Sequence, residues 1–309
     1  MDALSEILLS MRLVSSVISR ARFTAPWAVR TTGARGAIFH VVMEGRCWLR
    51  DGPTGERVEL GAGDLVLLSH GGAHVICDSP DTSPEVPIAE LPRNEGKRVV
   101  HGGGGQATSI LCGTFRLDHA AASTLLAALP PIVRVSRGTT PVVEWFDTTL
   151  RMVEATMDAV EPGGEAITSR LLDVLFAQLL RSCAASLPAT GWLTAVHDPQ
   201  IGRALALIHR DPGALFTVEG LARQAGLSRS VFYERFTTLL DEPPAKYLAR
   251  WRVMTGADLL RRSPVDLASL ATQLGYGSED AFSRTFKRHY GLTPREFRKA
   301  LAVPELTIH

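Results

Sequence analysis

The sequence has little cysteine, few aromatic residues and no long apolar run, and each shortage excludes a class of protein. Four cysteines in 309 residues lack the paired spacing of a zinc or disulfide framework. No apolar run reaches the roughly 18 residues of a membrane span, and Asp2 and Glu6 do not fit a secretory signal. Neither a phosphate-binding Gly-x4-Gly-Lys loop nor a Gly-x-Ser-x-Gly elbow occurs. We therefore expect a cytoplasmic protein without a membrane partner, whose cysteines stay reduced.

Charge is distributed unevenly along the chain. The net charge of the whole chain is only +1. Residues 199–309 carry 16 Lys and Arg against 11 Asp and Glu, whereas residues 1–198 carry 17 against 21. A basic segment attracts phosphates without regard to base sequence, and such an attraction weakens as salt rises.

One pattern is written twice between Thr217 and Phe297. Its first copy consists of Leu221, Gly226, Ser228, Phe232 and Phe236, and its second of Leu270, Gly275, Ser278, Phe282 and Phe286. In each copy the glycine supplies the positive φ that ends a first helix, and the serine caps a second helix. The two phenylalanines, four residues apart, point to the core. This spacing predicts a duplicated helix-turn-helix.

The opposite face of each second helix is predicted to be exposed. In a helix-turn-helix this helix enters the major groove, and two of them about one DNA turn apart read adjacent groove segments. The alternative is an ordinary helical bundle with solvated polar faces. The candidate DNA-binding residues are Arg229, Ser230, Tyr233, Glu234, Glu279, Asp280, Ser283, Arg284, Lys287 and Arg288.

Two further helices are predicted around these copies. Pro243 and Pro244 interrupt the chain, and residues 245–262 then have helical apolar periodicity, which predicts a helix that separates the copies. Thr293 with Glu296 forms a capping-box pattern before a closing helix. We expect this helix to pack through Phe297 and Leu301.

These residues resemble the AraC/XylS family of transcription regulators. The resemblance rests on residues 226–228, 235–236, 251–260 and 274–298 and covers about the last third of the chain. It implies a seven-helix DNA-binding domain whose third and sixth helices lie in consecutive major grooves. The reading faces are not purely basic, because they include Glu234, Glu279 and Asp280. Carboxylates accept hydrogen bonds from cytosine amino groups but repel phosphates.

Short β-type runs separated by turn residues dominate the N-terminal part and predict a small barrel. The runs are residues 37–43, 46–50, 57–60, 64–69, 74–77, 98–101 and 109–115. Gly63-x5-Ser69-x-Gly71-x2-His74-x3-Asp78 resembles the second cupin motif, and the segment from Phe39 to Gly45 resembles a degraded first motif. Members of the regulator family often carry such a cupin as a sensor.

The candidate metal or effector residues of this barrel are His40, His74, Cys47 and Cys112. His40 and His74, with Glu44, are donors that a divalent metal such as zinc or iron accepts. However, Ile38 stands where the first motif has another histidine, and Glu44 is expected in a hairpin turn. An organic effector in the barrel mouth, a reactive thiolate beside a histidine, and the absence of any ligand stay open as alternatives.

Helices are predicted for residues 118–129, 142–160 and 165–187. The last has a wide apolar stripe that includes Ile167, Leu172, Leu175, Leu179 and Cys183. Such a stripe is typical of a symmetric dimer contact or of intramolecular core, and the sequence leaves both open.

Together these features predict an α+β two-domain protein that is not an enzyme. A cupin-like β-barrel with a helical extension, for sensing and dimerisation, is expected over residues 1–187, a linker over 188–200, and an all-α double helix-turn-helix domain over 201–303. The predicted partners are double-stranded DNA, a small-molecule effector, a second copy of the chain and, for an activator, RNA polymerase. The alternatives are a metal-dependent cupin enzyme with a DNA-binding tail and an architectural DNA protein.

Overall fold

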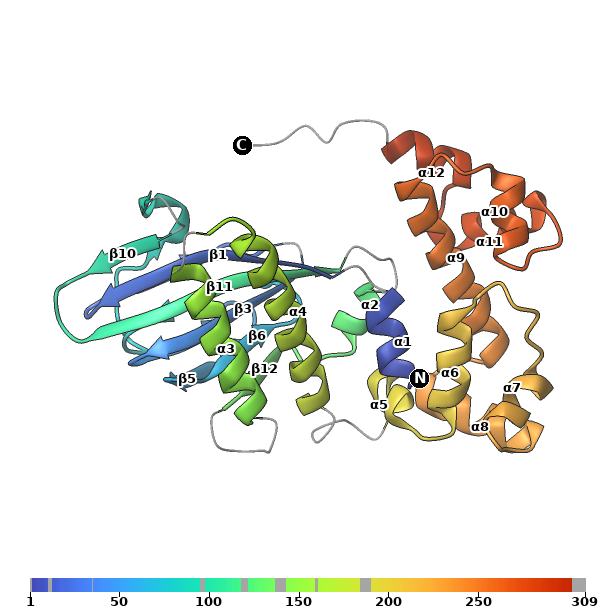
Figure 1. Cartoon of the computed structure of the whole chain (residues 1–309), viewed down its shortest axis with the longest axis horizontal. Coiled ribbons are helices and arrows are strands. Elements are labelled where there is room, and N and C mark those ends of the chain that lie inside the picture. Colours follow the sequence, from blue (N-terminus) through green and yellow to red (C-terminus); the bar gives the residue numbers. More distant parts are fainter. Residues whose placement is uncertain are drawn as a thin grey trace. The chain divides into compact units, whose positions relative to one another are not determined.

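A computed structural model gives the fold (Figure 1), and the residues it describes are 2–10, 13–34, 36–94, 98–117, 122–136, 143–158, 161–183 and 190–301. The chain forms two compact units, of which one comprises residues 13–117 and 129–186 and the other comprises residues 1–12, 118–128 and 187–309. The segment predicted as a linker contains a helix, α5 (Trp192–His197). The domain boundaries taken from the sequence stay a prediction.

The first unit contains two β-sheets. The larger has the order β12 (Ile132–Val135), β6 (Leu65–Leu68), β3 (Ala37–Glu44), β11 (Ala107–Leu117), β1 (Leu13–Thr24), β10 (Arg98–Gly102), β9 (Arg93–Asn94). The smaller has the order β5 (Arg57–Gly61), β4 (Arg46–Asp51), β7 (His74–Cys77), β2 (Ala28–Thr31), β8 (Val86–Pro87), which a short 3-10 turn, η1 (Ile88–Glu90), follows. Among the described residues the edge strands do not pair to close a barrel, so the expected barrel is corrected to two sheets.

The strands predicted from the sequence are confirmed, but the longest strand was missed. β1 pairs antiparallel with β11 and parallel with β10, and therefore lies inside the larger sheet. Its inward positions mix apolar Val17 and Ala21 with the buried hydroxyls of Ser15 and Ser19. This mixture blurs the apolar alternation that identifies a half-buried strand.

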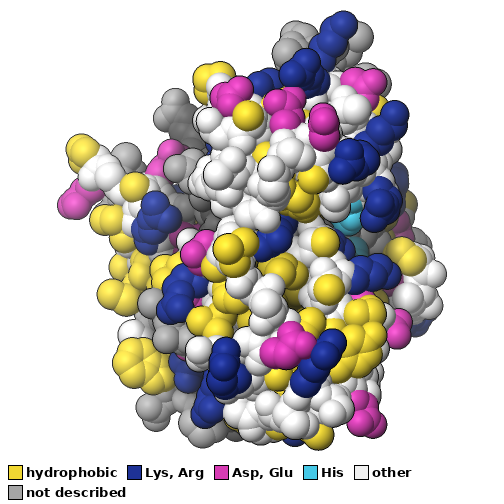
Figure 2. Space-filling model, turned by 90° about the vertical axis from the view of Figure 1, so that its right-hand side faces the viewer, with side chains coloured by type: hydrophobic (Ala, Val, Ile, Leu, Met, Phe, Trp, Pro, Cys, Tyr) yellow, Lys and Arg dark blue, Asp and Glu magenta, His cyan; other side chains and the backbone are white. Residues whose placement is uncertain are grey.

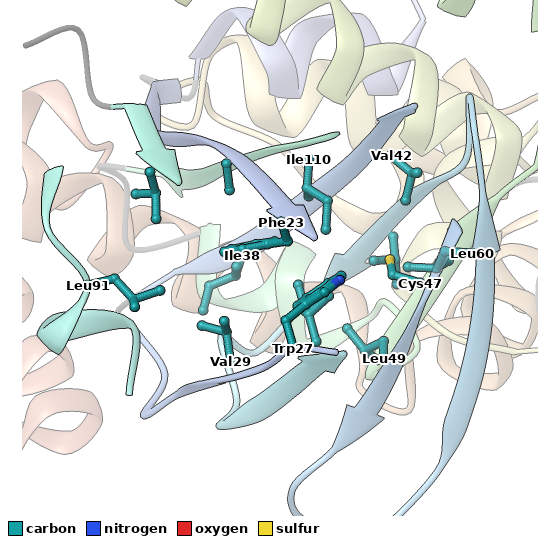
Figure 3. Packing of buried hydrophobic residues seen from close by; sticks show 14 of the residues in the cluster. Phe23, Trp27, Val29, Ile38, Val42, Cys47, Leu49, Leu60, Leu91 and Ile110 are labelled. Carbon is teal, nitrogen blue, oxygen red and sulfur yellow. The ribbon is translucent and has the colours of Figure 1, made fainter. Parts of the chain in front are cut away.

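The core of the first unit lies between the two sheets (Figure 3). Phe23 of β1 and Trp27, in the connection to β2, stack with ring centroids 4.4 Å apart. Ile38 and Ile110 extend the core from the larger sheet, and Leu49 does so from the smaller. Burying such a side chain contributes about 1.5 to 3 kcal/mol, so this shared core is what holds the two sheets face to face.

Two helices, α3 (Val143–Asp158) and α4 (Gly164–Cys183), lie over the larger sheet in Figure 1. Phe176 of α4 packs on Phe115 of β11 with ring centroids 4.9 Å apart. The hydroxyl of Ser15 donates to a carboxylate oxygen of Asp173 at 2.7 Å. Most of the apolar stripe of α4 is buried in this packing, whereas Ile167 is exposed. Residues 118–121, 142, 159–160 and 184–187 of the predicted helices lie outside the described residues.

The second unit is helical and confirms the duplicated helix-turn-helix. It contains α1 (Ala3–Ser10), α2 (Ala122–Ala127), α5, α6 (Ile201–Arg210), α7 (Val218–Gln224), α8 (Arg229–Leu240), α9 (Pro244–Arg262), α10 (Leu267–Gln273), α11 (Glu279–Tyr290) and α12 (Pro294–Leu301). Helix α1 packs on α6. The predicted capping box is present, because Thr293 N–H donates to Glu296 Oε2 at 2.7 Å. Phe297 joins the core, and the side chain of Leu301 lies outside the described residues. No described helix combines the length and apolar character that crossing a bilayer requires.

Candidate nucleic-acid interface and candidate ligand cavity

The two helix-turn-helix units share the same local construction. Gly226 ends α7 with a φ of 71°, and Gly275 ends α10 with a φ of 74°, a region that favours glycine. The hydroxyl of Ser228 accepts from the N–H of Val231 at 3.4 Å and caps α8. Ser278 caps α11 in the same way. In both copies the turn is therefore followed by a capped second helix that runs in a different direction from the first helix.

Paired phenylalanines anchor both second helices. Phe232 and Phe236 are fully buried with ring centroids 5.5 Å apart, and Phe282 and Phe286 are fully buried at the same separation. Since residues four apart share one face of a helix, the opposite faces of α8 and α11 are left exposed. The predicted inward positions are thus confirmed, and these opposite faces carry the candidate contacts.

The exposed face of α11, the second helix of the second helix-turn-helix, is basic. Arg284, Lys287 and Arg288 are exposed and make no ion pair among the residues that the structure describes. Glu279 is half-buried and binds the guanidinium of Arg295 from α12 at 3.0 Å. Its charge is therefore compensated within the domain. Asp280 is exposed and Ser283 is half-buried.

The exposed face of α8, the second helix of the first helix-turn-helix, has fewer free cations than that of α11. Arg229 forms an ion pair with Glu219 of α7 at 2.9 Å, and Arg235 binds Asp198 at 2.6 Å. Ser230 and Glu234 are exposed, and Tyr233 is 47% exposed. Val231, which the sequence reasoning missed, is 48% exposed. An exposed valine on such a face is suited to contact a thymine methyl group.

Figure 2 shows the side of the molecule that carries the C-terminal helices on the right of Figure 1. Lys and Arg side chains lie at several places on this side, with Asp and Glu side chains between them. The basic charge is therefore interrupted by acids, as the modest excess of cations in residues 199–309 predicts.

A cavity of about 200 Å³ lies in the core between the two sheets. Most of its lining is apolar and comes from both sheets: Ile18, Ala21, Phe23, Val29, Ile38, Ile76 and Ile88. His40 and Cys112 contribute polar atoms to its wall, and Arg93 lines it as an exposed residue. The predicted effector residues His40 and Cys112 thus meet in this cavity, whereas Cys47 lies in the surrounding core.

His40, His74 and Cys112 form one buried hydrogen-bonded chain. His74 Nδ1 lies 2.8 Å from the carbonyl oxygen of Gly72, which accepts only, so this nitrogen carries the proton. The Nε2 atoms of His40 and His74 are 2.8 Å apart, so in the neutral pair His40 donates and His74 accepts. His40 Nδ1 then accepts from the thiol of Cys112 at 3.0 Å. Burial lowers the pKa of both histidines, which keeps the chain neutral.

This arrangement does not fit the divalent metal that a cupin implies. In the neutral chain each imidazole lone pair accepts a hydrogen bond, His74 Nε2 from His40 and His40 Nδ1 from Cys112, so neither lone pair is free to bind a metal ion. Glu44 is exposed at the end of β3, beside the turn at Gly45, as expected. Within the described ranges, no group of three His, Cys, Asp or Glu side chains is placed to hold a metal ion.

The thiols are not activated. Burial raises the pKa of Cys112 to about 12 and that of Cys183 to about 11. It raises the pKa of Cys47 and Cys77 as well. Since the thiolate is the reactive form, the structure speaks against the alternative of a reactive thiol.

A double helix-turn-helix with a basic face, together with a two-sheet cupin region, defines the class of DNA-binding transcription regulators. Residues 2–185 match the cupin family, and residues 221–300 match the family described as a helix-turn-helix domain. An AraC-like transcription regulator of Streptomyces lividans is 32% identical over 98% of this chain and 100% of its own length. The transcriptional regulator AlkR of Acinetobacter baylyi is 31% identical over 97% of this chain and 99% of its own length.

Among solved structures, the DNA-binding domain of AdpA in complex with a target DNA is 31% identical, with a TM-score of 0.32. It covers 33% of this chain and 92% of its own length. The chain belongs to the AraC family of transcription regulators and carries an N-terminal cupin region. Its relatives are regulators and not enzymes, as the sequence predicted.

Proposed function

We propose that this AraC-type regulator controls transcription in response to a small molecule bound in the cupin cavity. The observation that carries this proposal is the cavity of about 200 Å³ between the two sheets. A pocket that is mostly apolar and has a few polar groups is typical of a small-molecule site. A sensor of this kind needs a signal that binds two states of the protein with different affinity.

The chemistry of the cavity favours a small, mainly apolar effector. His40 and Cys112 already bind each other, and the other polar groups of the lining are the hydroxyls of Ser19, Thr31 and Thr32 and the exposed Arg93, so the buried part of the wall carries no charge. An engineered apolar cavity of about 150 Å³ accommodates benzene, and a somewhat larger monocyclic or short alkyl compound suits this volume.

The DNA-contacting residues that we propose lie on the exposed faces of α8 and α11. Arg284, Lys287 and Arg288 supply phosphate or base contacts from α11, with Glu279, Asp280 and Ser283 beside them. From α8 the contacts come from Arg229, Ser230, Tyr233 and Glu234. This assignment is supported by their position opposite the buried phenylalanines, where Glu279 and Ser283 are half-buried and the others are exposed.

We also propose a homodimer that forms through α3 and α4. Trp145 and Met152 on α3 are 72% and 54% exposed, and Ile167 and Val174 on α4 are 53% and 46% exposed. Large apolar side chains on adjacent helices are typical of a self-association surface. As an activator, the regulator would also bind RNA polymerase.

The effector proposal is tested by screening monocyclic aromatic and short alkyl compounds against the full-length protein. We expect at least one to raise its melting temperature and to change its affinity for DNA that it selects from a random library. Ala21→Leu fills the cavity from β1 and should abolish both responses. Val100→Leu, on the exposed face of β10, should keep them.

Two results would contradict the proposal. The first is a panel in which no compound binds the protein. The second is a compound that binds but leaves operator affinity and transcription unchanged at saturation. DNA affinity without compound should stay the same in Ala21→Leu, which separates loss of sensing from loss of folding.

A further inference from the structure

Arg252 lies in α9 between the residues that pack on the two helix-turn-helix units. Before it, Tyr247 contacts Phe236 of α8 with ring centroids 5.5 Å apart. Directly after it, Val253 belongs to the core around Phe282 of α11. The position of Arg252 on α9 is therefore the junction of the two half-cores.

The guanidinium of Arg252 joins three chain segments at this junction. Its Nε donates to the carbonyl of Pro212 at 2.6 Å, and Nη2 donates to that of Ala214 at 2.8 Å. Both carbonyls belong to the loop that leads into α7. Nη1 donates to the carbonyl of Gly275, in the turn between α10 and α11, at 3.4 Å. One side chain of α9 thus binds the start of the first helix-turn-helix and the turn of the second.

The loop and the turn also touch through their backbones. A Cβ on Gly213 would lie 2.0 Å from the carbonyl oxygen of Gln273, and a Cβ on Gly275 would lie 2.5 Å from that of Gly213. Such distances leave no room for a side chain at either position. Glycine at 213 and 275 is therefore what allows the loop and the turn to approach within reach of one guanidinium.

Apolar packing does not fill this junction. A groove of about 220 Å³ lies beside Arg252 and is lined by Leu221 of α7, Leu248 of α9 and Tyr276 of the turn. Beside the continuous helix α9, the hydrogen bonds of Arg252 therefore supply a second link between the two helix-turn-helix units at a place that apolar side chains leave open. A lysine has one nitrogen in place of the planar fork and reaches fewer of these carbonyls at once.

We infer that Arg252 is a positioning residue, which holds the two helix-turn-helix units at the separation needed to bind two adjacent major grooves at once. Binding through two linked units gains affinity because the second contact forms within an existing complex. That gain depends on the geometry between the units. Without Arg252 each unit keeps its own core, but the pair is held less firmly.

The test uses the DNA duplex that the wild-type full-length protein selects from a random library. Affinity is measured for this duplex, for versions with one half scrambled, and for versions with one base pair inserted or removed between the halves. Arg252→Met should weaken binding to the intact duplex by at least about tenfold. Its affinity for either half-scrambled duplex should stay within about twofold of wild type. It should also lose less affinity than wild type when the spacing changes.

Two further variants separate positioning from charge and from folding. Lys246→Met removes a cation from the exposed surface of α9 and should leave the discrimination between spacings unchanged. Gly213→Ala alters no charge but pushes the loop from the turn, and should reproduce the spacing phenotype of Arg252→Met. The double variant should be no worse than the more affected single variant, because both act at one junction.

The inference rests on DNA binding by both units, and the experiment distinguishes the two failures. If scrambling one half leaves wild-type binding unchanged, binding through two units is wrong. If wild type needs both halves but Arg252→Met and Gly213→Ala lose equal affinity for intact and half-scrambled duplexes, Arg252 acts as an ordinary DNA or stability residue. Unchanged binding of the intact duplex by Arg252→Met would also overturn the inference. Should Arg252→Met fail to fold, the spacing phenotype of Gly213→Ala decides the question alone.

Discussion

The two helix-turn-helix units have the same interior and different exterior surfaces. Both bury a phenylalanine pair with ring centroids 5.5 Å apart, and both begin the second helix with a serine cap. On their exposed faces, Arg284 of α11 makes no described ion pair, whereas Arg229 of α8 is bound to Glu219. Duplication thus preserves the packing that orients each helix, while the face that meets DNA is free to diverge.

The connections that end the helices differ as well. Gly275 is crowded by the carbonyl of Gly213, whereas a side chain at Gly226 would meet open space. Helix α11 ends at Gly291 with a φ of 76°, whereas α8 ends at Asp241 with a φ of 54°. The second helix-turn-helix is therefore more tightly fitted, and the first helix-turn-helix contains more local strain.

The strongest test of the shared interior removes one phenylalanine from each copy. Phe286→Ala and Phe236→Ala should each cost about 3 to 5 kcal/mol, because both rings are fully buried in tight aromatic clusters. Hydrogen exchange should show lost amide protection in α11 for the first variant and in α8 for the second. Equal losses in both helices for either variant would mean that the two copies do not have separate cores.

The turn glycines give an unequal pair of predictions. Gly226→Ala should cost about 1 to 2 kcal/mol, because only the left-handed conformation is strained. Gly275→Ala should cost about 2 to 5 kcal/mol, since its methyl group also collides with the backbone of Gly213. Thermal unfolding of the two variants measures the difference. Similar costs for both substitutions would show that the loop before α7 yields easily.

The divergent reading faces predict unequal contributions to DNA binding. Arg284→Ala should weaken operator binding by about 1 to 3 kcal/mol, because this arginine is exposed and free of ion pairs in the described part of the chain. Arg229→Ala should cost less than Arg284→Ala, since its ion pair with Glu219 must be broken to bind DNA. Affinities for the selected duplex at fixed salt provide the comparison.

Glu219→Gln sharpens this comparison. It releases Arg229 from its ion pair, so Arg229→Ala should cost more in the Glu219→Gln background than in wild type. Lys287→Ala serves as the non-specific reference and should weaken binding to all sequences about equally, with a smaller salt dependence. An identical cost of Arg229→Ala in both backgrounds would mean that the ion pair does not restrain this residue.

Sequence periodicity was sufficient to predict the elements whose apolar positions repeat. The helix-turn-helix units, the helix between them and the capping box at Thr293 follow from local spacing. β1 was missed, because buried Ser15 and Ser19 interrupt its alternation. Whether the sheets close into a barrel depends on edge pairing between distant strands, which no local pattern encodes.

The site shows the same division between local and distant information. Exposure of Arg284 could be predicted from helical period alone. The compensation of Glu279 by Arg295 could not, since the partner comes from another helix. Likewise, Cys112 lies beside His40 only because β3 and β11 pair in that register. The three groups that Arg252 binds are backbone carbonyls, which have no side-chain signature, so no sequence pattern predicts these contacts.

The smallest predicted effect concerns the ends of the two reading helices. Asp241 is held in the left-handed region, and its carboxylate lies at the negative end of α8. Asp241→Gly removes both penalties and should stabilise the protein by about 1 kcal/mol. Asp241→Asn removes only the charge and should gain about 0.3 to 0.5 kcal/mol.

Gly291, the counterpart of Asp241 in the second helix-turn-helix, tests the sign of this effect. Gly291→Ala introduces the strain that Asp241 already has and should destabilise by about 1 kcal/mol. Denaturant unfolding of the three variants at one pH measures these differences. If Asp241→Gly destabilises the protein instead, the carboxylate makes a contact that outweighs the strain. The first helix-turn-helix is then fitted as closely at this end as the second helix-turn-helix.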